Sequence, residues 1–367
     1  MLPWWKIRRE LNRLAVQALS IPARIYEPFL QKSYDKKFKE NITLSRGEVD
    51  NTGRIAIFLI YQASSLEKSI FTTCFHLRKH GYSPIIVSNT PLSSVNKLQL
   101  SKHSLLIIER PNFGYDFGGY RDAVKIIFEN NLMPDELLFL NDSVWFPLMQ
   151  DSEMLEKMQA MSATYVGTHV LGDIHISGRK RGFFPSYCFL IKSPVCRSKA
   201  FINFWNEYRL SSNKELTKRR GERLLSHVML DDSKVSTALL SKERYDNIVN
   251  GLSGEELHYA VQDFVPERNR YIWQKNYLLT KKVSAGWEED AKSMLINGTN
   301  AWTYTWASPV LSLTKLDFPM IKKKKDRLFQ TSRYNIVKAH KEGRLPKLDL
   351  TIFSEISKAV EEQITEI

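Results

Sequence analysis

Between Arg54 and Ser143, short apolar runs alternate with amphipathic segments, and this alternation constrains the fold more than any other feature of the chain. We expect strands at 54–61, 83–88, 105–109 and 136–140, and helices at 66–80 and 120–130. Strands that alternate with helices favour a mostly parallel sheet that is buried on both faces. Ligands of such sheets bind beyond the carboxyl ends of the strands. The pattern therefore predicts an α/β fold with its site at that edge.

The rest of the chain indicates a three-part organisation. Further strands are expected at 165–168 and 187–191, and further helices at 200–209, 221–229 and 350–367. The expected parts are a basic N-terminal extension over 1–50, an α/β nucleotide-binding domain over 51–265, and a mostly helical C-terminal region over 266–367. The C-terminal region also carries the basic run Lys322–Lys325.

The N-terminal extension predicts an amphipathic helix, because its apolar residues recur at spacings of three and four while basic residues occupy another face. The apolar stripe consists of Trp4, Ile7, Leu11, Leu14 and Ala18. Tryptophan beside Lys and Arg is typical of a helix that lies on an anionic membrane surface. The alternative is a helix that packs on the core of the protein itself.

Composition narrows the setting in which the protein works. The net charge of +13 suits a polyanionic partner, but no nucleic-acid-binding motif accompanies it, so we expect no nucleic acid. The chain shows neither an apolar run of transmembrane length nor a signal-peptide pattern. Cys74, Cys188 and Cys196 fit neither a disulfide framework nor a metal site, and we expect buried thiols. These features predict a cytoplasmic protein, peripheral at the inner face of the cytoplasmic membrane.

The densest polar motif is Arg110–Asp122, which follows the third expected strand and reads RPNFGYDFGGYRD. Its glycines fall in an expected strand-to-helix turn, where glycine lets the backbone approach a ligand closely. The helix N-terminus that follows would attract an anion. The motif predicts a nucleotide-diphosphate or sugar site, and the alternative is an ordinary turn in which Asp116 caps the helix. The candidate binding residues are Asn112, Gly114, Asp116, Gly118, Gly119, Arg121 and Asp122.

A second polar motif, Asn141-Asp142-Ser143, follows the apolar strand at 136–140. A carboxylate at such a strand end can bind Mg²⁺ or Mn²⁺, which in turn binds a diphosphate. Two carboxylates are usual for such an ion, and the motif offers Asp142 alone. The alternative is an Asx turn that ends the strand. We take Asp142 as a candidate catalytic residue and metal ligand, and its two neighbours as candidate donor-binding residues.

A third motif, Gly221-Glu222-Arg223, is expected to open an amphipathic helix. Glu222 there either complements the helix dipole or acts as a general base on an acceptor hydroxyl. His169 and His175 lie near Asp173, but their spacing matches no zinc pattern, so we expect a loop or core role for them.

Together these motifs resemble the rhamnan synthesis F family of bacterial polysaccharide glycosyltransferases. The matching segments run in family order from about residue 54 to 325. They are Asn112–Asp116, Leu140–Ser143, Ser186–Phe189 with Phe204-Trp205, Gly221-Glu222, and Phe318–Lys322 with Trp306 before it. Two departures stand out: the single acid at 141–143 leaves metal dependence open, and Phe184-Pro185 stands where family members often carry His-Gln.

The resemblance implies a GT-A-like fold and transfer of a sugar, often rhamnose or another deoxyhexose, from a nucleotide-sugar donor to a growing surface polysaccharide. It implies an inverting reaction in which Glu222 occupies the position of the base and residues 141–143 that of the metal motif. The expected partners are the nucleotide sugar and a glycan or lipid-linked acceptor, to which the basic, tryptophan-rich N-terminal helix adds an anionic membrane surface. The alternative is a non-catalytic, transferase-like scaffold of a membrane polysaccharide-synthesis complex, which the weakened Asp142 motif favours.

Overall fold

The computed structural model describes residues 8, 10, 21–62, 65–176, 179–229 and 236–365. The N-terminal amphipathic helix predicted from Trp4 to Ala18 lies outside the described residues, apart from Arg8 and Glu10. Among the described residues, no helix combines the length and the apolar character needed to cross a membrane.

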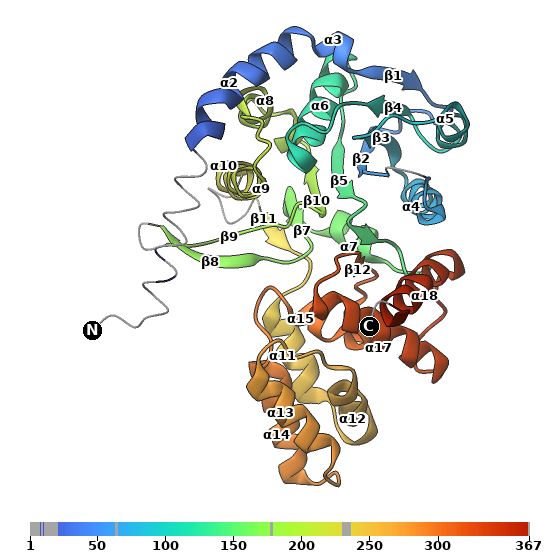
Figure 1. Ribbon diagram of the computed structural model, residues 1–367, viewed down its shortest axis with the longest axis vertical. Coiled ribbons are helices and arrows are strands. Elements are labelled where there is room, and N and C mark those ends of the chain that lie inside the picture. The colour runs from blue at the N-terminus through green and yellow to red at the C-terminus, as the bar shows by residue number, and fades with distance from the viewer. Residues whose placement is uncertain are drawn as a thin grey trace.

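An eight-stranded mixed sheet forms the centre of the molecule (Figure 1), with the strand order β1-β4-β3-β2-β5-β10-β7-β11. Its strands are β1 (Thr43–Arg46), β2 (Arg54–Ile60), β3 (Ser83–Ser88), β4 (Leu106–Glu109), β5 (Glu136–Asn141), β7 (Tyr165–Gly167), β10 (Cys188–Lys192) and β11 (Ser236–Ala238). The central strands β4, β3, β2 and β5 are parallel, while β1 and β10 run antiparallel to their neighbours. The expected α/β class with a mostly parallel core is confirmed.

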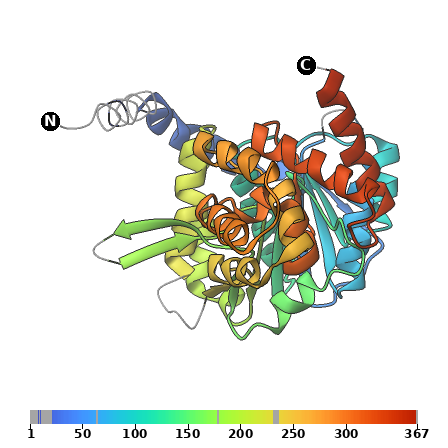
Figure 2. The same cartoon turned by 90° about the horizontal axis from the view of Figure 1, so that it is seen from below.

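Two further strand pairs lie outside this sheet. The pair β6 (Val144–Trp145) and β12 (Ile321–Lys322) is antiparallel and joins the end of β5 to the C-terminal region. The hairpin β8 (Leu171–Ile176) and β9 (Arg179–Phe183) projects away from the body of the molecule, as Figure 2 shows.

Helices surround the sheet and form the C-terminal region. In the N-terminal two thirds of the chain they are α2 (Ile21–Lys36), α3 (Phe38–Asn41), α4 (Lys68–Lys79), α5 (Ser94–Ser101), α6 (Tyr115–Glu129), α7 (Met154–Ala160), α8 (Lys199–Glu207), α9 (Lys214–Lys218) and α10 (Leu224–Met229). A 3₁₀ turn, η1 (Val195–Arg197), precedes α8, and a π-helical turn, η2 (Arg219–Arg223), joins α9 to α10. The later helices are α11 (Lys242–Gly251), α12 (Gly254–Asp263), α13 (Asn269–Leu279), α14 (Ala285–Asn297), α15 (Tyr304–Ala307), α16 (Pro309–Leu316), α17 (Arg327–Lys341) and α18 (Leu350–Thr365).

The central strands bury both of their faces because successive side chains point to opposite sides. In β2, Ile55, Ile57 and Leu59 join one core with side chains of α6 and α8. The alternate residues join a second core with α4 and with aromatic residues of the C-terminal region, including Trp306 and Phe318. The near-continuous apolar sequence of the strand follows from this burial on both faces.

The ends of the chain are integrated with the sheet. At the N-terminal side, β1 pairs with β4 and α2 lies against the loops after α8, where Gln31 bonds the backbone of Tyr208 and Leu210. At the C-terminal side, helical structure begins at α11, earlier along the chain than residue 266. The described N-terminal segment therefore extends the sheet through β1, and the C-terminal region meets the segment after β5 through the pairing of β12 with β6.

Candidate functional site

The carboxyl ends of β2 and β5 form the topological switch point of the sheet, because β3 and β4 lie on one side of β2 and β5 lies on the other. Asp142 follows β5, and its Oδ2 accepts hydrogen bonds from the backbone N–H of Tyr61 at 2.8 Å and from Gln62 Nε2 at 2.7 Å. Both donors follow β2 in the sequence. The carboxylate is thus fixed at the switch point, and it is partly exposed there.

The two main polar motifs meet at this point through Asn141. This side chain is buried and donates from Nδ2 to Asp116 Oδ2 at 3.0 Å. Its Oδ1 accepts from the backbone N–H and the hydroxyl of Ser143 at 3.2 and 2.6 Å. The structure therefore brings Asp116, Asp142 and Ser143 into one polar cluster.

Burial raises the pKa of Asp116 to about 6, with Glu222 and Asp142 adding to the rise and Lys322 opposing it. Three carboxylates from three different elements therefore share one electrostatic environment. A carboxyl group with a raised pKa, such as that of Asp116, is typical of functional sites.

Glu222 reaches the cluster from η2. Its Oε1 accepts a hydrogen bond from the backbone N–H of Ser186 at 3.0 Å, and the carbonyl of Ser186 is held by the Tyr120 hydroxyl at 2.8 Å. The expectation that Gly221 opens a helix is wrong, because η2 lies inside a continuous helical stretch from α9 to α10. A β-carbon on Gly221 would lie 2.4 Å from the Phe117 ring, which explains the glycine. Single π-helical turns within α-helices are frequent at functional sites.

The glycines of the first motif have a packing role that the sequence did not predict. Helix α6 begins at Tyr115, so Gly118 and Gly119 lie inside the helix and not in a turn before it. A β-carbon on Gly119 would lie 2.3 Å from Leu59 Cδ1, and one on Gly118 would lie 2.1 Å from the Phe113 carbonyl oxygen. Gly119 allows α6 to approach β2 closely, and Gly118 allows the helix to lie close to the backbone at Phe113. Gly114 alone has the expected left-handed conformation, with φ of 86° at the N-cap.

Arg121 and Asp122 belong to a buried network beside α2. Asp122 accepts from Arg110 Nε at 2.6 Å and from the Tyr34 hydroxyl at 2.6 Å. Arg121 Nη2 contacts both carboxylate oxygens of Asp35, at 2.8 and 2.9 Å. These contacts tie α2 to α6, and the buried Arg121 Nε is left without a hydrogen-bond partner among the described residues. Asn112, by contrast, is exposed in the loop before α6.

Lys322 is the site residue that sequence reasoning missed. Its Nζ donates to Ser143 Oγ at 3.0 Å and lies 4.0 Å from the centroid of the Tyr187 ring. Burial lowers the pKa of Lys322 to about 7, while Asp116 and Glu222 act to raise it. The sequence grouped this residue with the basic run, although it also ends the matching segment Phe318–Lys322, which was the available signal.

The predicted core residues behave as expected where their side chains are described. His169 is buried, and its Nδ1 lies within hydrogen-bond distance of the hydroxyls of Thr168 and Tyr187. Burial lowers the pKa of His169 to about 3, and the positive charge of Lys322 also acts to lower it. This confirms a core role for His169, whereas the side chains of His175 and Asp173 lie outside the described residues. The three cysteines are free and buried, as predicted. Phe184 is buried against Tyr165, with ring centroids 4.7 Å apart.

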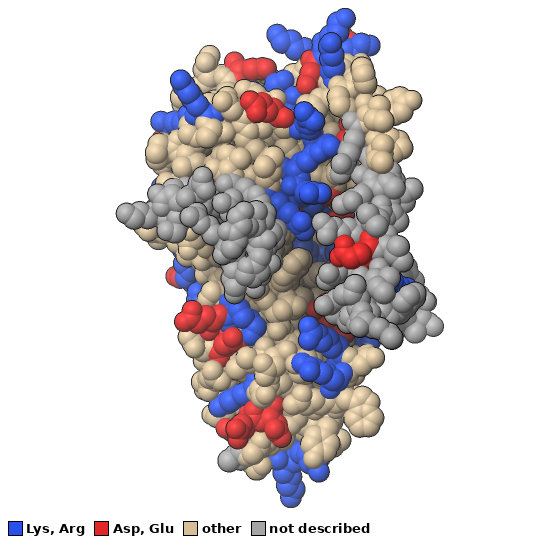
Figure 3. All heavy atoms as spheres, turned by 90° about the vertical axis from the view of Figure 1, so that its left-hand side faces the viewer, with Lys and Arg blue, Asp and Glu red and all other residues tan. Residues whose placement is uncertain are grey.

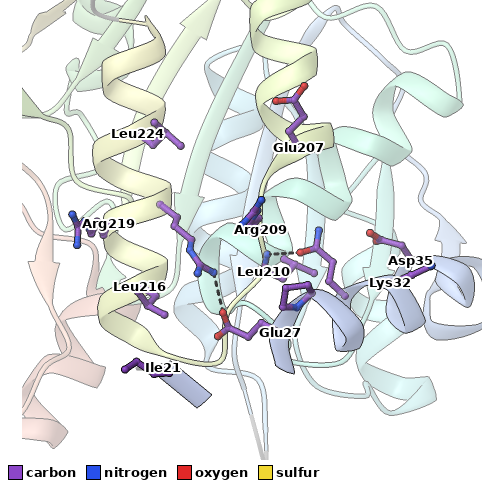
Figure 4. A pocket seen from close by; sticks show the side chains of 13 residues that line it. Ile21, Glu27, Lys32, Asp35, Glu207, Arg209, Leu210, Leu216, Arg219 and Leu224 are labelled. Carbon is purple, nitrogen blue, oxygen red and sulfur yellow. Dashed lines mark hydrogen bonds and ion pairs between the residues drawn. The ribbon is translucent and has the colours of Figure 1, made fainter. Parts of the chain in front are cut away.

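A separate cavity of about 1350 Å³ lies between α2 and the helical stretch that carries Glu222 (Figure 4). Glu27 of α2 bonds Arg220 Nη1 at 2.9 Å across it. Lys32, Arg209 and Arg219 also line this cavity. Figure 3 shows Lys and Arg side chains gathered along this side of the molecule. The contact between Glu27 and Arg220 links α2 to the residue two positions before Glu222.

A mostly parallel sheet with a polar, carboxylate-rich site at its switch point defines an α/β protein of the class that binds its ligand beyond the strand ends. The family model described as rhamnan synthesis protein F matches residues 84–279, which is more than half of the chain. The chain belongs to this family, as its motifs predicted. Membership identifies it as a glycosyltransferase of polysaccharide synthesis.

Individual proteins similar to the chain cover it to different extents. It is 28% identical over 360 residues to the uncharacterized protein y4gN of Sinorhizobium fredii, a match that covers 96% of this chain and 91% of that protein. It is 32% identical over 130 residues to the virulence protein VirA of Vibrio anguillarum, covering 33% of this chain and 42% of VirA. Among solved structures it is similar to the mannosyltransferase PcManGT from Pyrobaculum calidifontis in complex with GDP-Man and Mn²⁺. That match has a TM-score of 0.28 and 8% identity, and it covers 95% of this chain and 97% of the other.

Proposed function

We propose that the chain transfers a sugar, rhamnose or another deoxyhexose, from a nucleotide-sugar donor to a growing surface polysaccharide, with inversion at the anomeric carbon. The observation that carries this proposal is the convergence of Asp116, Asp142 and Glu222 at the switch point of a GT-A-like sheet. Each carboxylate comes from a different element, and each is partly exposed. A polar site of this kind suits a ligand with many hydroxyl groups.

The donor diphosphate lies over the start of α6 in this proposal. Gly114 sits at the N-cap of a 15-residue helix, whose first turn offers backbone N–H groups and positive potential to an anion. Exposed Asn112 and Ser143 flank the same region. Gly119 contributes by allowing α6 to lie close to β2, and Gly118 by allowing it to lie close to the backbone at Phe113. Arg121 and Asp122 contribute by fixing α6 to α2. Asn141 orients Asp116 toward the donor.

Asp142 is the carboxylate we assign to the donor side of the site. Among the described residues, no group of three or more His, Cys, Asp or Glu side chains could hold a metal ion. A single carboxylate still fits Mg²⁺ or Mn²⁺, since such ions bind proteins through one or two carboxylates together with waters and substrate phosphates. A bound ion would neutralise negative charge on the diphosphate.

Glu222 is the general base of the proposed reaction. Its carboxylate takes the proton of the acceptor hydroxyl as the acceptor oxygen forms a bond to the anomeric carbon. The bond between that carbon and the phosphate oxygen breaks, and the nucleoside diphosphate leaves. The hydrogen bond from Ser186 fixes one oxygen of Glu222 and leaves the carboxylate oriented. Positioned proton transfer of this kind is worth about 10²- to 10⁴-fold in rate.

The acceptor in this proposal is a lipid-linked glycan, and α2 faces the membrane that holds it. Apolar side chains of α2 are exposed on the side opposite its contacts with α6 and with the loop after α8, notably Ile25, Tyr26, Phe29 and Leu30. Lysines follow in the same helix and in the next. Exposed apolar groups beside cations suit an anionic bilayer surface. Loss of vesicle binding in a Tyr26→Ser, Phe29→Ser variant would support this contact, and unchanged binding would contradict it.

The test of the proposed function is transfer from a panel of nucleotide sugars to a lipid-linked acceptor, with Mn²⁺ or with a chelator. We expect Glu222→Gln to lower kcat by about 10²-fold or more while the melting temperature is kept. We expect Asp142→Asn to give the same low rate with and without Mn²⁺. Glu215→Gln is the matched control, because Glu215 is an exposed acid in the helix α9 that precedes η2. If no donor supports either transfer or hydrolysis, the enzymatic function is contradicted and the alternative of a non-catalytic scaffold is favoured.

A further inference from the structure

Lys322 brings a cation to the switch point from the C-terminal region of the chain. Strand β12 pairs antiparallel with β6, with Lys322 opposite Val144, directly after the Asn141–Ser143 turn. The backbone N–H of Lys323 donates to the Ser143 carbonyl at 3.0 Å. Lys322 therefore lies beside the region that the proposed donor diphosphate occupies.

The ammonium of Lys322 forms no ion pair with a carboxylate of the described residues. Among the described residues, Ser143 Oγ is its one hydrogen-bond acceptor, and no carboxylate oxygen lies within 4.0 Å of Nζ in an ion pair. The three nearby acids are held by neutral donors: Asp116 by Asn141, Asp142 by Tyr61 and Gln62, and Glu222 by Ser186. An ammonium has three N–H donors, so donor capacity remains for a ligand.

The position of Lys322 is fixed by its surroundings. Arg333 of α17 is buried, and its Nη1 donates to the carbonyls of Lys322 and Lys324 at 2.8 Å each. The aliphatic stem ends over the face of the Tyr187 ring, which favours a cation. A cation that is held in place before the ligand arrives requires little reorganisation when negative charge develops.

We propose that Lys322 is a donor-site residue that binds the diphosphate of the nucleotide sugar and stabilises the negative charge of the departing nucleoside diphosphate. This inference rests on the proposed function, and it adds a cation from the protein itself to the site. The lysine acts on the phosphate oxygens, whereas Glu222 acts on the acceptor hydroxyl. The other reading is that Lys322 only balances the charges of Asp116 and Glu222.

Binding measurements separate these readings without any need for transfer. We suggest calorimetric titration of GDP, UDP and dTDP, and of the corresponding nucleosides, into the full chain and its variants. Lys322→Met removes the charge and keeps a similar volume, while Lys322→Arg keeps the charge. Lys325→Met is the control, because Lys325 belongs to the same run and is exposed. Melting temperatures of all variants report on the fold.

We expect Lys322→Met to weaken binding of the preferred nucleoside diphosphate by about 10- to 100-fold, the range of a charge-assisted hydrogen bond. Nucleoside binding should stay unchanged, Lys322→Arg should retain most of the diphosphate affinity, and Lys325→Met should match the wild type. In transfer assays with an active donor, Lys322→Met should lower kcat more than it raises KM, because charge develops in the transition state.

Two results would overturn the inference and leave the proposed function standing. The first is diphosphate affinity in Lys322→Met within about twofold of the wild type, less than one charge-assisted contact provides. The second is an equal loss of nucleoside and diphosphate binding, which would indicate a general distortion. A wild type that binds no nucleotide would contradict both this inference and the proposed function. If diphosphate binding depends on Lys322 but the protein shows no transfer activity, the proposed role of Lys322 in binding is supported and the proposed enzymatic function is contradicted.

Discussion

Asn141 donates from Nδ2 to Asp116 Oδ2 at 3.0 Å, and this bond joins the end of β5 to the first turn of α6. The same amide accepts from Ser143 through Oδ1. One buried side chain therefore sets the relative position of an acid on a helix and a hydroxyl on a turn.

Replacing Asn141 should damage activity more than stability. We expect Asn141→Ala to lower kcat/KM by up to about 10²-fold, because small displacements of positioned groups have effects of this size. The free energy of unfolding should fall by about 1–3 kcal/mol, since the buried amide of Asn141 is lost and Asp116 and Ser143 each lose a hydrogen-bond partner. Steady-state kinetics and urea denaturation measure the two effects. Asn130→Ala, which removes an amide at the end of α6, should leave kcat/KM unchanged; equal kinetics in both variants would argue against the role of Asn141.

The raised pKa of Asp116 predicts a defined pH dependence of stability. Its pKa is about 6 in the folded chain against 3.8 for the unfolded chain, so the native state holds this proton more tightly. The stabilisation is therefore complete below about pH 4 and is lost as pH rises through 6. The groups that face Asp116 are Lys322, Glu222, Asp142 and Lys214.

The contribution of Asp116 to the free energy of unfolding is isolated by subtracting the value for the Asp116→Asn variant from that of the wild type. The difference in free energy of unfolding between wild type and variant should decline from pH 4 to pH 6 and stay level above that range. Urea denaturation at closely spaced pH values is the measurement. A difference that is flat across the whole range would show that Asp116 titrates normally.

A methyl group on Gly119 should destabilise the fold through direct overlap. The added carbon would lie 2.3 Å from Leu59 Cδ1, and overpacking of this kind costs about 1–3 kcal/mol. The matched control is Gly286→Ala in α14, where no atom lies within 4 Å of the added carbon. That change should stabilise by about 0.5–1 kcal/mol, because alanine favours helix. Thermal denaturation compares the two, and a Gly119→Ala protein as stable as the control would refute the packing role.

Removing Glu27 should affect the helix that carries Glu222. Glu27 is buried, bonds Arg220 at 2.9 Å and accepts from the Ser211 hydroxyl. We expect Glu27→Ala to destabilise by about 3 kcal/mol, because it leaves a partly buried arginine without its partner. Transfer should also slow, since η2 loses its contact with α2. Glu207→Ala, an exposed acid on the same cavity, should change neither quantity, and a double Glu27→Met, Arg220→Met variant should recover part of the stability.

The strands could be predicted because their apolar runs are local: β3 was predicted with its observed bounds, and β2 to within one residue. Helix α6 begins five residues earlier than expected, because Gly118 and Gly119 are typical of a turn. In the structure they serve close packing, Gly119 against Leu59 and Gly118 against the Phe113 carbonyl. Lys322 could not be placed, since its contact with Ser143 spans 179 positions. The π-helical turn at Gly221 likewise depends on Phe117 of another helix. The features that could not be predicted from the sequence depend on contacts between segments that are distant along the chain.

The pairing of β12 with β6 has a consequence for how the protein matures during synthesis. The strands of the central sheet all lie before residue 239, so they are synthesised before the last third of the chain, including the residues that cover one face of the sheet. Lys322 and the strand that holds it emerge much later. A nascent or truncated chain that stops before β12 would contain the strands of the sheet and the three acids but not Lys322. Any activity that depends on this cation would therefore begin only when translation is nearly finished.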